Sequence, residues 1–220
     1  MSIMVVIPAF NEEARIGATL EAVKSLPGIS RILVVSDGST DRTPDVARQL
    51  GVEVLELAAN QGKGGAMNAS LPLIDTDIVV FLDADLGQSA REAGKLIDPL
   101  IKGTADLSIA AFPPPTRKGG FGIVKGTAAW ALRRQGQMQA ASPLSGQRAM
   151  HRQVLQVVAP FQERYGVELG MTLTALRKGF RVVEVPTLMS HNESGRNLTG
   201  FIHRGRQFLD ILRLLFLVRR

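Results

Sequence analysis

The sequence RILVVSDGSTDRTPDVARQLGVEVLEL, residues 31–57, contains a complete strand–helix–strand unit. Residues 31–35 and 52–57 are short runs rich in Val, Ile and Leu, and a helical pattern at 43–50 separates them. Apolar runs of this kind, alternating with helices, are typical of parallel strands that are buried on both faces. The unit therefore predicts an α/β fold with a mostly parallel sheet flanked by helices.

The same alternation continues on both sides of this unit. Strands are predicted at 3–7, 78–82, 107–111 and 182–185, and helices at 12–26, 64–73, 91–102, up to about 139, at 167–178 and at 200–220. Residues 112–122 read as a Pro/Gly loop. The chain shows no internal repeat and no low-complexity linker, so its 220 residues are expected to form one domain with an elaborated C-terminal portion.

The composition excludes several classes of protein. A chain with 45% hydrophobic and 21% charged residues is not disordered. The absence of cysteine excludes disulfides, thiolate nucleophiles and Cys-ligated metal sites. The N-terminus, MSIMVVIPAF, lacks a basic segment and soon reaches a proline, so it reads as a strand and not as a signal peptide. A cytoplasmic protein is the expectation.

The net charge of +6 is concentrated at the C-terminus. Residues 196–220 contain six arginines and one acid, whereas the other 195 residues hold 20 basic and 19 acidic groups. A near-neutral body argues against a nucleic-acid-binding protein, whose basic residues would cover a working face. The helix predicted at 201–220 has two alternative roles: packing against the body or a second subunit as a homodimer, or peripheral contact with an anionic membrane.

Polar residues follow each of the first four predicted strands. These segments are 8–13 (PAFNEE), 36–41 (SDGSTD), 60–65 (NQGKGG) and 83–85 (DAD). Each segment alone is weak evidence, because Asp, Asn, Ser and Gly are common in turns. Ligands of open parallel sheets bind beyond the carboxyl ends of the strands, so four such segments on one edge predict a ligand site there.

Asp83 and Asp85 end a wholly apolar strand with one small residue between them. Side chains two apart in extended chain point the same way, so both carboxylates are able to face one ion. Mg²⁺ and Mn²⁺ accept one or two carboxylates and complete their shells with phosphates and water. The alternative is an ordinary turn in which Asp85 caps a helix.

Two further segments point to an anionic ligand. Lys63 lies among glycines at the start of a predicted helix, where backbone can approach a phosphate and a cation can assist. A plain glycine-rich turn is the alternative. Asp37, just after the second strand, is placed to accept hydrogen bonds from a base or a ribose, or to form an Asx turn.

Taken together, these segments resemble the nucleotide-sugar-binding half of the GT-A glycosyltransferases of family 2. The matching strings are VVIPAFNEE (5–13), SDGSTD (36–41), NQGKGGAMN (60–68) and FLDADL (81–86). On the acceptor side, SPLSGQRAM (142–150), residues 165–186 and MSHNESGR (189–196) are similar to polyprenyl-phosphate sugar transferases and glucosyl-3-phosphoglycerate synthases. The resemblance implies a nucleotide-binding half at 1–111, an acceptor half at 112–200 and a basic helix at 201–220.

The resemblance also implies roles for individual residues. Those expected around the nucleotide-sugar are Pro8, Ala9, Asn11, Glu12, Asp37, Lys63, Asp83 and Gly146. Asp83 and Asp85 match the DxD motif that holds Mg²⁺ or Mn²⁺, and His191 matches a histidine ligand of that metal. Asp85 and Glu168 are the expected catalytic residues. Because the sequence lacks the ED-type motif of inverting relatives, Glu168 is its candidate base.

The predicted function is metal-dependent transfer of a sugar from a nucleoside diphosphate sugar to an acceptor. The weak base signal and the basic tail favour a phosphorylated acceptor, which the resemblance implies to be of the polyprenyl phosphate or phosphoglycerate type. Lys63 or Arg196 is expected to assist electrostatically. The alternatives are a non-catalytic nucleotide-sugar-binding protein and a sugar nucleotidyltransferase. The latter is disfavoured because IPAFNEE replaces the Gly-rich loop expected after its first strand.

Overall fold

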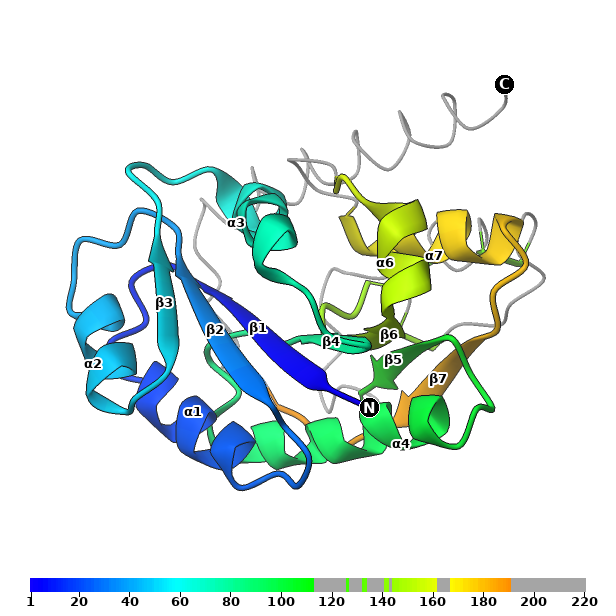
Figure 1. Cartoon of the computed structure of the whole chain (residues 1–220), viewed down its shortest axis with the longest axis horizontal. Coiled ribbons are helices and arrows are strands. Elements are labelled where there is room, and N and C mark those ends of the chain that lie inside the picture. The colour runs from blue at the N-terminus through cyan, green and yellow to red at the C-terminus, as the bar shows by residue number, and fades with distance from the viewer. Residues whose placement is uncertain (113–125, 127–131, 134–140, 143, 162–166, 191–220) are drawn as a thin grey trace.

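The computed structural model describes residues 1–112, 126, 132–133, 141–142, 144–161 and 167–190 (Figure 1). Except for residues 126, 132 and 133, the helical stretch predicted before residue 139 lies outside this range, as does the helix at 200–220. In the part of the chain that is described, no helix is both long and apolar enough to cross a membrane.

The first half of the chain alternates strands and helices, as the sequence predicts. Its elements are β1 (Ile3–Ala9), α1 (Ile16–Lys24), β2 (Arg31–Ser36), α2 (Thr43–Gln49), β3 (Glu53–Glu56), α3 (Gly62–Ser70), β4 (Ile78–Phe81), α4 (Ala93–Ile101) and β5 (Leu107–Ala111). Short 3₁₀ segments, η1 (Leu71–Leu73) and η2 (Gly87–Glu92), follow α3 and precede α4. The predicted continuous helices at 64–73 and 91–102 are therefore each divided into an α-helix and a 3₁₀ turn.

The second half contributes β6 (Arg148–His151), α6 (Arg152–Val158), α7 (Val167–Arg177) and β7 (Val182–Pro186). Seven strands form one sheet in the order β3-β2-β1-β4-β6-β5-β7. All neighbouring strands are parallel except β6, which runs antiparallel to both β4 and β5. The sheet thus combines strands from both halves, and the prediction of a mostly parallel sheet is confirmed.

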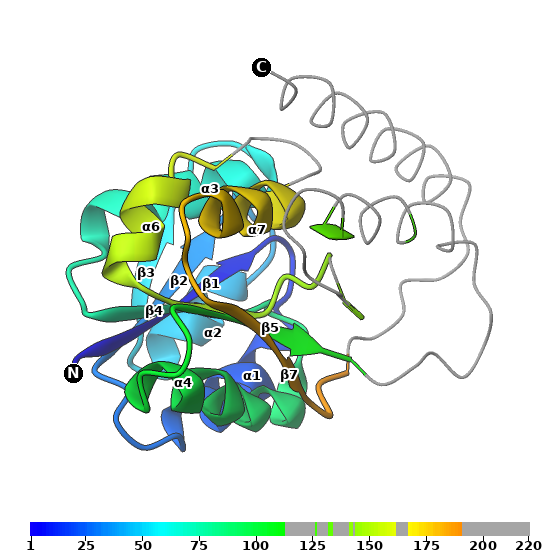
Figure 2. The ribbon, with the colours of Figure 1, turned by 90° about the vertical axis from the view of Figure 1, so that its right-hand side faces the viewer.

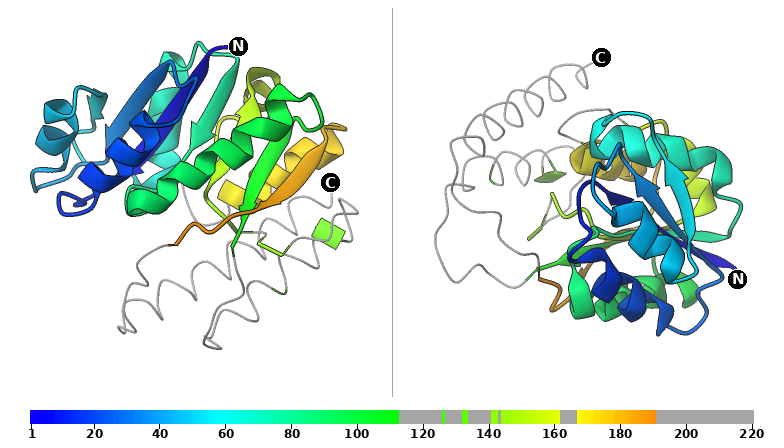
Figure 3. Two further views of the ribbon diagram at one scale, coloured as in Figure 1. Left: turned by 90° about the horizontal axis from the view of Figure 1, so that it is seen from below. Right: turned by 90° about the vertical axis from the view of Figure 1, so that its left-hand side faces the viewer.

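The strands bury both faces, and the two faces form separate apolar clusters. In β1, Ile3, Val5 and Ile7 pack with α1, α2 and α4, whereas Met4 and Val6 pack on the face covered by α3, α6 and α7. Figures 1 and 2 show these two helical layers on opposite sides of the sheet, and Figure 3 shows α1 and α4 lying across one face. The period of two in an all-apolar strand explains why one run of sequence serves both cores.

The helix α1 begins at Ile16, later than the sequence predicts, because the preceding residues bind the next loop. The amides of Glu12 and Glu13 donate to Thr43 Oγ1 at 2.7 Å and to Asp41 Oδ2 at 3.1 Å. Asn11 has a φ of +55°, a left-handed conformation that asparagine tolerates. These contacts fasten the β1 loop to the β2 loop and set the helix start back by four residues.

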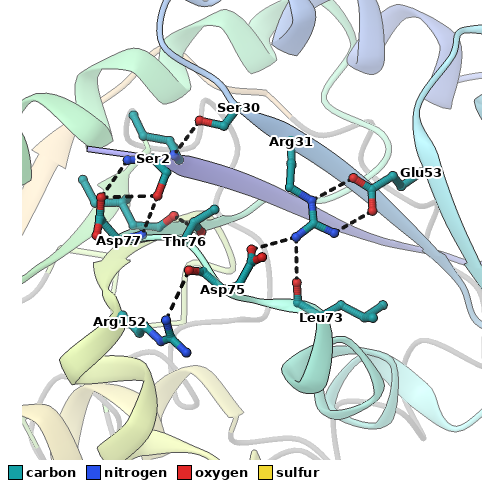
Figure 4. A network of polar contacts seen from close by, with 11 residues as sticks. Ser2, Ser30, Arg31, Glu53, Leu73, Asp75, Thr76, Asp77 and Arg152 are labelled. Atoms are coloured by element: carbon teal, nitrogen blue, oxygen red, sulfur yellow. Dashed lines mark hydrogen bonds and ion pairs between the residues drawn. The ribbon is translucent and has the colours of Figure 1, made fainter.

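A polar network joins the start of β2, the strand β3 and the segment before β4 (Figure 4). Arg31 donates from Nε and Nη2 to both carboxylate oxygens of Glu53, at 2.8 and 2.7 Å. Its Nη1 donates to Asp75 Oδ1 at 2.7 Å and to the carbonyl oxygen of Leu73 at 3.0 Å. The network lies at the amino ends of the strands, opposite the edge at which ligands of such sheets bind.

Replacing Arg31 with alanine is expected to lower the free energy of unfolding by about 1 kcal/mol, because a bidentate but partly exposed network is worth little more. For a chain of this size the melting temperature then falls by about 2–4 °C. Lys95→Ala, which removes the exposed ammonium that pairs with Glu92 three residues earlier, is the control and should leave the melting temperature nearly unchanged. Equal losses in the two variants in thermal denaturation would contradict a structural role for the network.

Candidate active site

The predicted ligand edge is formed by the carboxyl ends of β1, β2 and β4. From β1 the chain proceeds outward to β2 and β3, and then returns to place β4 on the other side of β1. In open α/β sheets such a reversal of strand order marks the binding crevice. Because β6 is antiparallel, its amino end pairs with the carboxyl end of β4, with Phe81 opposite Arg148. Residues 145–147, which precede β6, are therefore brought to the same edge.

Asp83 is held by side chains from both halves of the chain. Lys63, on α3, donates from Nζ to Asp83 Oδ1 at 2.6 Å. Gln147 donates from Nε2 to Asp83 Oδ2 at 2.6 Å, and its Oε1 accepts the amide hydrogen of Asp83 at 2.9 Å. The orientation of the Asp83 carboxylate is thereby fixed by a lysine and by a glutamine amide.

Lys63 also faces Glu168, in the first turn of α7, with 3.5 Å between Nζ and Oε1. Burial by itself lowers the pKa of the Lys63 ammonium, but the charges of Asp83 and Glu168 outweigh it and raise the pKa above its ordinary value. The side chain of Glu168 is 16% exposed and that of Lys63 is 33% exposed. The ammonium thus joins a carboxylate of the predicted donor side to one of the predicted acceptor side.

Gly146 lies against this ion pair. A Cβ atom built on Gly146 would collide with Lys63 Nζ and come within 3.3 and 3.4 Å of the two carboxylate oxygens of Asp83. The lysine reaches Asp83 only because the residue here has no side chain. Gly146, which the sequence analysis expects in the nucleotide-sugar site, therefore lies beside Lys63 and Asp83.

Asp85 lies in a loop that is held by Thr19, a residue of α1. Thr19 Oγ1 donates to the carbonyl oxygen of Ala84 at 2.8 Å and accepts the amide hydrogen of Gly87 at 2.8 Å. Glu12 lies near this loop. Burial raises its pKa, Arg15 opposes the rise, and the negative charge of Asp85 adds to it. The negative charges of Glu12 and Asp85 are therefore close enough to affect each other, while Arg15 pairs with Glu12 at 2.6 Å.

The residues expected around the nucleotide lie on the same edge. Pro8 and Ala9 end β1, and the Ala9 carbonyl oxygen accepts the amide hydrogen of Asp37 at 2.8 Å. Asp37 is 4% exposed, and its Oδ1 accepts the amide hydrogen of Gln61, just before α3, at 2.8 Å. Asp37 thus positions the glycine-rich turn that leads to Lys63.

Asn11 uses its side chain within the protein. Its side-chain Oδ1 accepts the backbone amide hydrogen of Thr40 at 2.8 Å, and the backbone amide of Asn11 donates to Ser39 Oγ at 3.2 Å. These bonds give Asn11 a structural role in fastening the β1 loop to the β2 loop. His191, Arg196 and the helix predicted at 201–220 lie outside the described residues.

Three polar residues of this region were not singled out by the sequence analysis. Gln147 orients Asp83, Thr19 supports the Asp85 loop, and Arg148, the residue after Gln147, is fully buried. Arg148 directly follows the residues SGQ and precedes two apolar residues, and this pattern could have indicated a buried arginine next to the site. Gln147 belongs to the SPLSGQRAM string on which the resemblance rests, but its contact with Asp83, 64 residues away, has no local signal. The contact of Thr19 with Ala84, 65 residues away, has none either.

The donor set around the DxD segment is made of oxygen atoms. Among the described residues, no group of three or more His, Cys, Asp or Glu side chains is arranged to hold a metal by itself. A divalent ion there would need ligands from a substrate or from water. This arrangement suits Mg²⁺ and Mn²⁺, which keep waters and bind substrate phosphates alongside one or two carboxylates.

Three comparisons place the chain among known proteins. An uncharacterised protein of Methanocaldococcus jannaschii is 30% identical over 90% of this chain and 88% of its own length. Glucosyl-3-phosphoglycerate synthase of Mycolicibacterium smegmatis is 29% identical over 96% of this chain and 76% of its own. The crystal structure of glucosyl-3-phosphoglycerate synthase from Mycobacterium tuberculosis with Mn²⁺, uridine diphosphate and glucosyl-3-phosphoglycerate superposes with a TM-score of 0.79 and 28% identity.

That superposition covers 96% of this chain and 78% of the mycobacterial one, and confirms the GT-A fold. The same enzyme has also been crystallised with Mg²⁺ and uridine diphosphate, with a TM-score of 0.80. The family model for glycosyl transferase family 2 matches residues 4–155, a range that includes β1 except its first residue, β2 to β6, and every loop of the edge described above. The chain therefore belongs to glycosyl transferase family 2.

Proposed function

We propose that this chain is a single catalytic domain that transfers a sugar from a uridine diphosphate sugar to a hydroxyl of a phosphorylated acceptor of the phosphoglycerate class. Membership of glycosyl transferase family 2 supports sugar transfer. The choice of donor and acceptor is supported by the solved relative, which was crystallised with uridine diphosphate glucose and phosphoglyceric acid.

The observation that carries this proposal is the position of Lys63. Its ammonium lies 2.6 Å from Asp83, at the end of the donor-side strand, and 3.5 Å from Glu168, on the acceptor-side helix. A sugar-transfer site needs a positive charge close to the departing diphosphate and a carboxylate close to the attacking hydroxyl. The two requirements are met by side chains that share one edge of the sheet.

The residues fit a divalent metal. Asp83 and Asp85 would hold Mg²⁺ or Mn²⁺, with the diphosphate completing the shell, and the Lys63 ammonium already places a positive charge against Asp83. His191, the third predicted ligand, is retained as part of this proposal. When bound, the metal supplies Lewis-acid neutralisation of the diphosphate charge.

In the proposed reaction, the bond between the anomeric carbon and the diphosphate oxygen breaks and its electron pair leaves with uridine diphosphate. A bond forms between the anomeric carbon and the acceptor oxygen, and the proton of that hydroxyl passes to Glu168. Lys63 stabilises the negative charge that develops on the leaving group. Pro8, Ala9, Glu12 and Asp37 line the nucleotide side, and Gly146 leaves room for the lysine.

The proposal is tested by incubating the purified protein with Mn²⁺, a panel of uridine and guanosine diphosphate sugars, and either 3-phosphoglycerate or a polyprenyl phosphate. Mass spectrometry should detect a glycosylated phosphoglycerate with a uridine donor, and chelation by EDTA should abolish the product. Product only with the lipid phosphate would overturn the acceptor class. Donor binding by calorimetry without transfer or donor hydrolysis would instead indicate a nucleotide-sugar-binding protein.

A further inference from the structure

Arg148 is a charged side chain with no access to solvent. It is 0% exposed and is the largest fully buried side chain among the described residues. In the sheet it lies between the apolar residues Phe81 of β4 and Ile109 of β5. Burying a guanidinium in such surroundings is costly, so its contacts must supply a compensating advantage.

The contacts of Arg148 run in two directions. Its Nε donates to the carbonyl oxygen of Ser145 at 2.8 Å, and its Nη1 donates to Thr172 Oγ1 at 2.7 Å. Thr172 Oγ1 in turn donates to the carbonyl oxygen of Glu168 at 2.9 Å. Within the described residues, Nη2 of Arg148 is buried without a hydrogen-bond partner.

The charge of Arg148 is retained despite its burial. Burial lowers the pKa of the guanidinium to about 10, and the charges of Glu168 and Glu184 oppose that decrease. Arg148 is therefore protonated at neutral pH and attracts the carboxylate of Glu168. Glu184, on β7, accepts the amide hydrogens of Ala141 and Ser142 at 2.6 and 2.8 Å, and so holds the start of the same loop.

The two directions lead to the two candidate carboxylates. Ser145 begins the short segment in which Gly146 faces Lys63 and Gln147 holds Asp83. Thr172 lies one helical turn after Glu168 on α7. A single guanidinium thus links the loop that orients Asp83 to the helical turn that carries Glu168.

We propose that Arg148 is a positioning residue that fixes Glu168 relative to the Lys63–Asp83 pair, and so sets the efficiency of transfer to the acceptor. The inference rests on the proposed function. The Thr172 hydroxyl lies on the branch of these contacts that leads to Glu168, and not on the Ser145 branch that leads to Asp83, so removing it should leave nucleotide binding nearly unchanged. Displacement of a reacting group by about 1 Å can cost two orders of magnitude in rate.

Thr172→Val tests this proposal most cleanly, because it removes only the hydroxyl that joins Arg148 to the Glu168 turn. Thr172→Ser restores that hydroxyl. Thr174→Val makes the same substitution on α7 at a partly buried position and is the matched control. Arg148→Lys keeps the charge but lacks the forked donors of the guanidinium.

Each variant is measured with uridine diphosphate by calorimetry, and with uridine diphosphate glucose and 3-phosphoglycerate by steady-state kinetics. Thr172→Val and Arg148→Lys are expected to lose about tenfold to a hundredfold in kcat/KM for the acceptor. Thr172→Val should in addition keep the Kd for uridine diphosphate within about twofold of wild type. Thr172→Ser and Thr174→Val should stay close to wild type in both measurements.

Two results would overturn the role of Arg148. One is transfer by Thr172→Val equal to that of Thr174→Val. The other is a loss of uridine diphosphate affinity in Thr172→Val as large as its loss of transfer, because general destabilisation of the site would produce both. If Arg148→Lys does not fold, Thr172→Val decides alone. Absence of transfer by the wild-type chain contradicts the proposed function, whereas normal transfer with insensitive variants contradicts only the positioning role.

Discussion

Replacing Asp85 with asparagine is expected to reduce metal-dependent sugar transfer about a thousandfold, which corresponds to about 4 kcal/mol of lost charge stabilisation. Asparagine keeps the size of the side chain but removes the negative charge that would attract a divalent ion. The loop itself should persist, because Thr19 holds it through Ala84 and Gly87.

The measurement for Asp85→Asn combines turnover at saturating donor with Mn²⁺ binding in the presence of uridine diphosphate, followed by electron paramagnetic resonance. Both should fall together. Asp98 is an exposed aspartate of α4 whose carboxylate pairs with Lys102. The variant Asp98→Asn is the control and should retain both turnover and Mn²⁺ binding. Undiminished Mn²⁺ binding and turnover in Asp85→Asn would remove the acidic pair from the mechanism.

Replacing Lys63 with methionine is expected to lower kcat by about a hundredfold to a thousandfold, the usual effect of removing one preorganised charge or donor from a transition state. Methionine preserves much of the length and packing of lysine. It leaves Asp83 and Glu168 without the cation that lies between them. Donor turnover, followed through release of uridine diphosphate, measures the effect.

Gly146→Ala tests the same interaction without changing the lysine. The new Cβ would occupy the position of Lys63 Nζ, so the ammonium has to withdraw from Asp83. Because a flexible side-chain end yields and the backbone does not have to move, the fold should survive while kcat falls. Gly17→Ala, where a Cβ meets Val46 Cγ1 at an ordinary 3.7 Å, should be neutral. Full activity in Gly146→Ala would show that the Lys63–Asp83 contact is dispensable.

The parts of the fold that repeat locally could be predicted from the sequence. Apolar strands of β1, β2 and β4 alternate with helices, and the polar residues after them reach one edge because parallel strands end together. The antiparallel strand β6 was not predicted. Its residues, Arg148–His151, carry no strand pattern, and their pairing is imposed by β4 and β5 on either side.

The candidate site was predictable as a set of residues but not as a set of contacts. Lys63, Asp83 and Glu168 were each expected, yet the sequence could not show that one ammonium faces both carboxylates, because Lys63 is 20 residues from Asp83 and 105 residues from Glu168 in the chain. Asn11 joins two loops from a left-handed backbone conformation, and no sequence motif predicted that conformation. Long-range geometry of this kind is decided by tertiary packing.

The reversed direction of β6 has a consequence for the connection that precedes it. If β5 were followed by another parallel strand, the chain would have to cross to the edge of the sheet where the parallel strands begin. Because β6 is antiparallel to β5, the connection between them, residues 112–147, starts and ends at the edge that carries Asp83. Insertions there add only slowly to the entropy of loop closure. Under the proposed function, a longer or differently composed connection would alter the acceptor side, while β1, β2 and β4 and the loops that follow them would keep their arrangement.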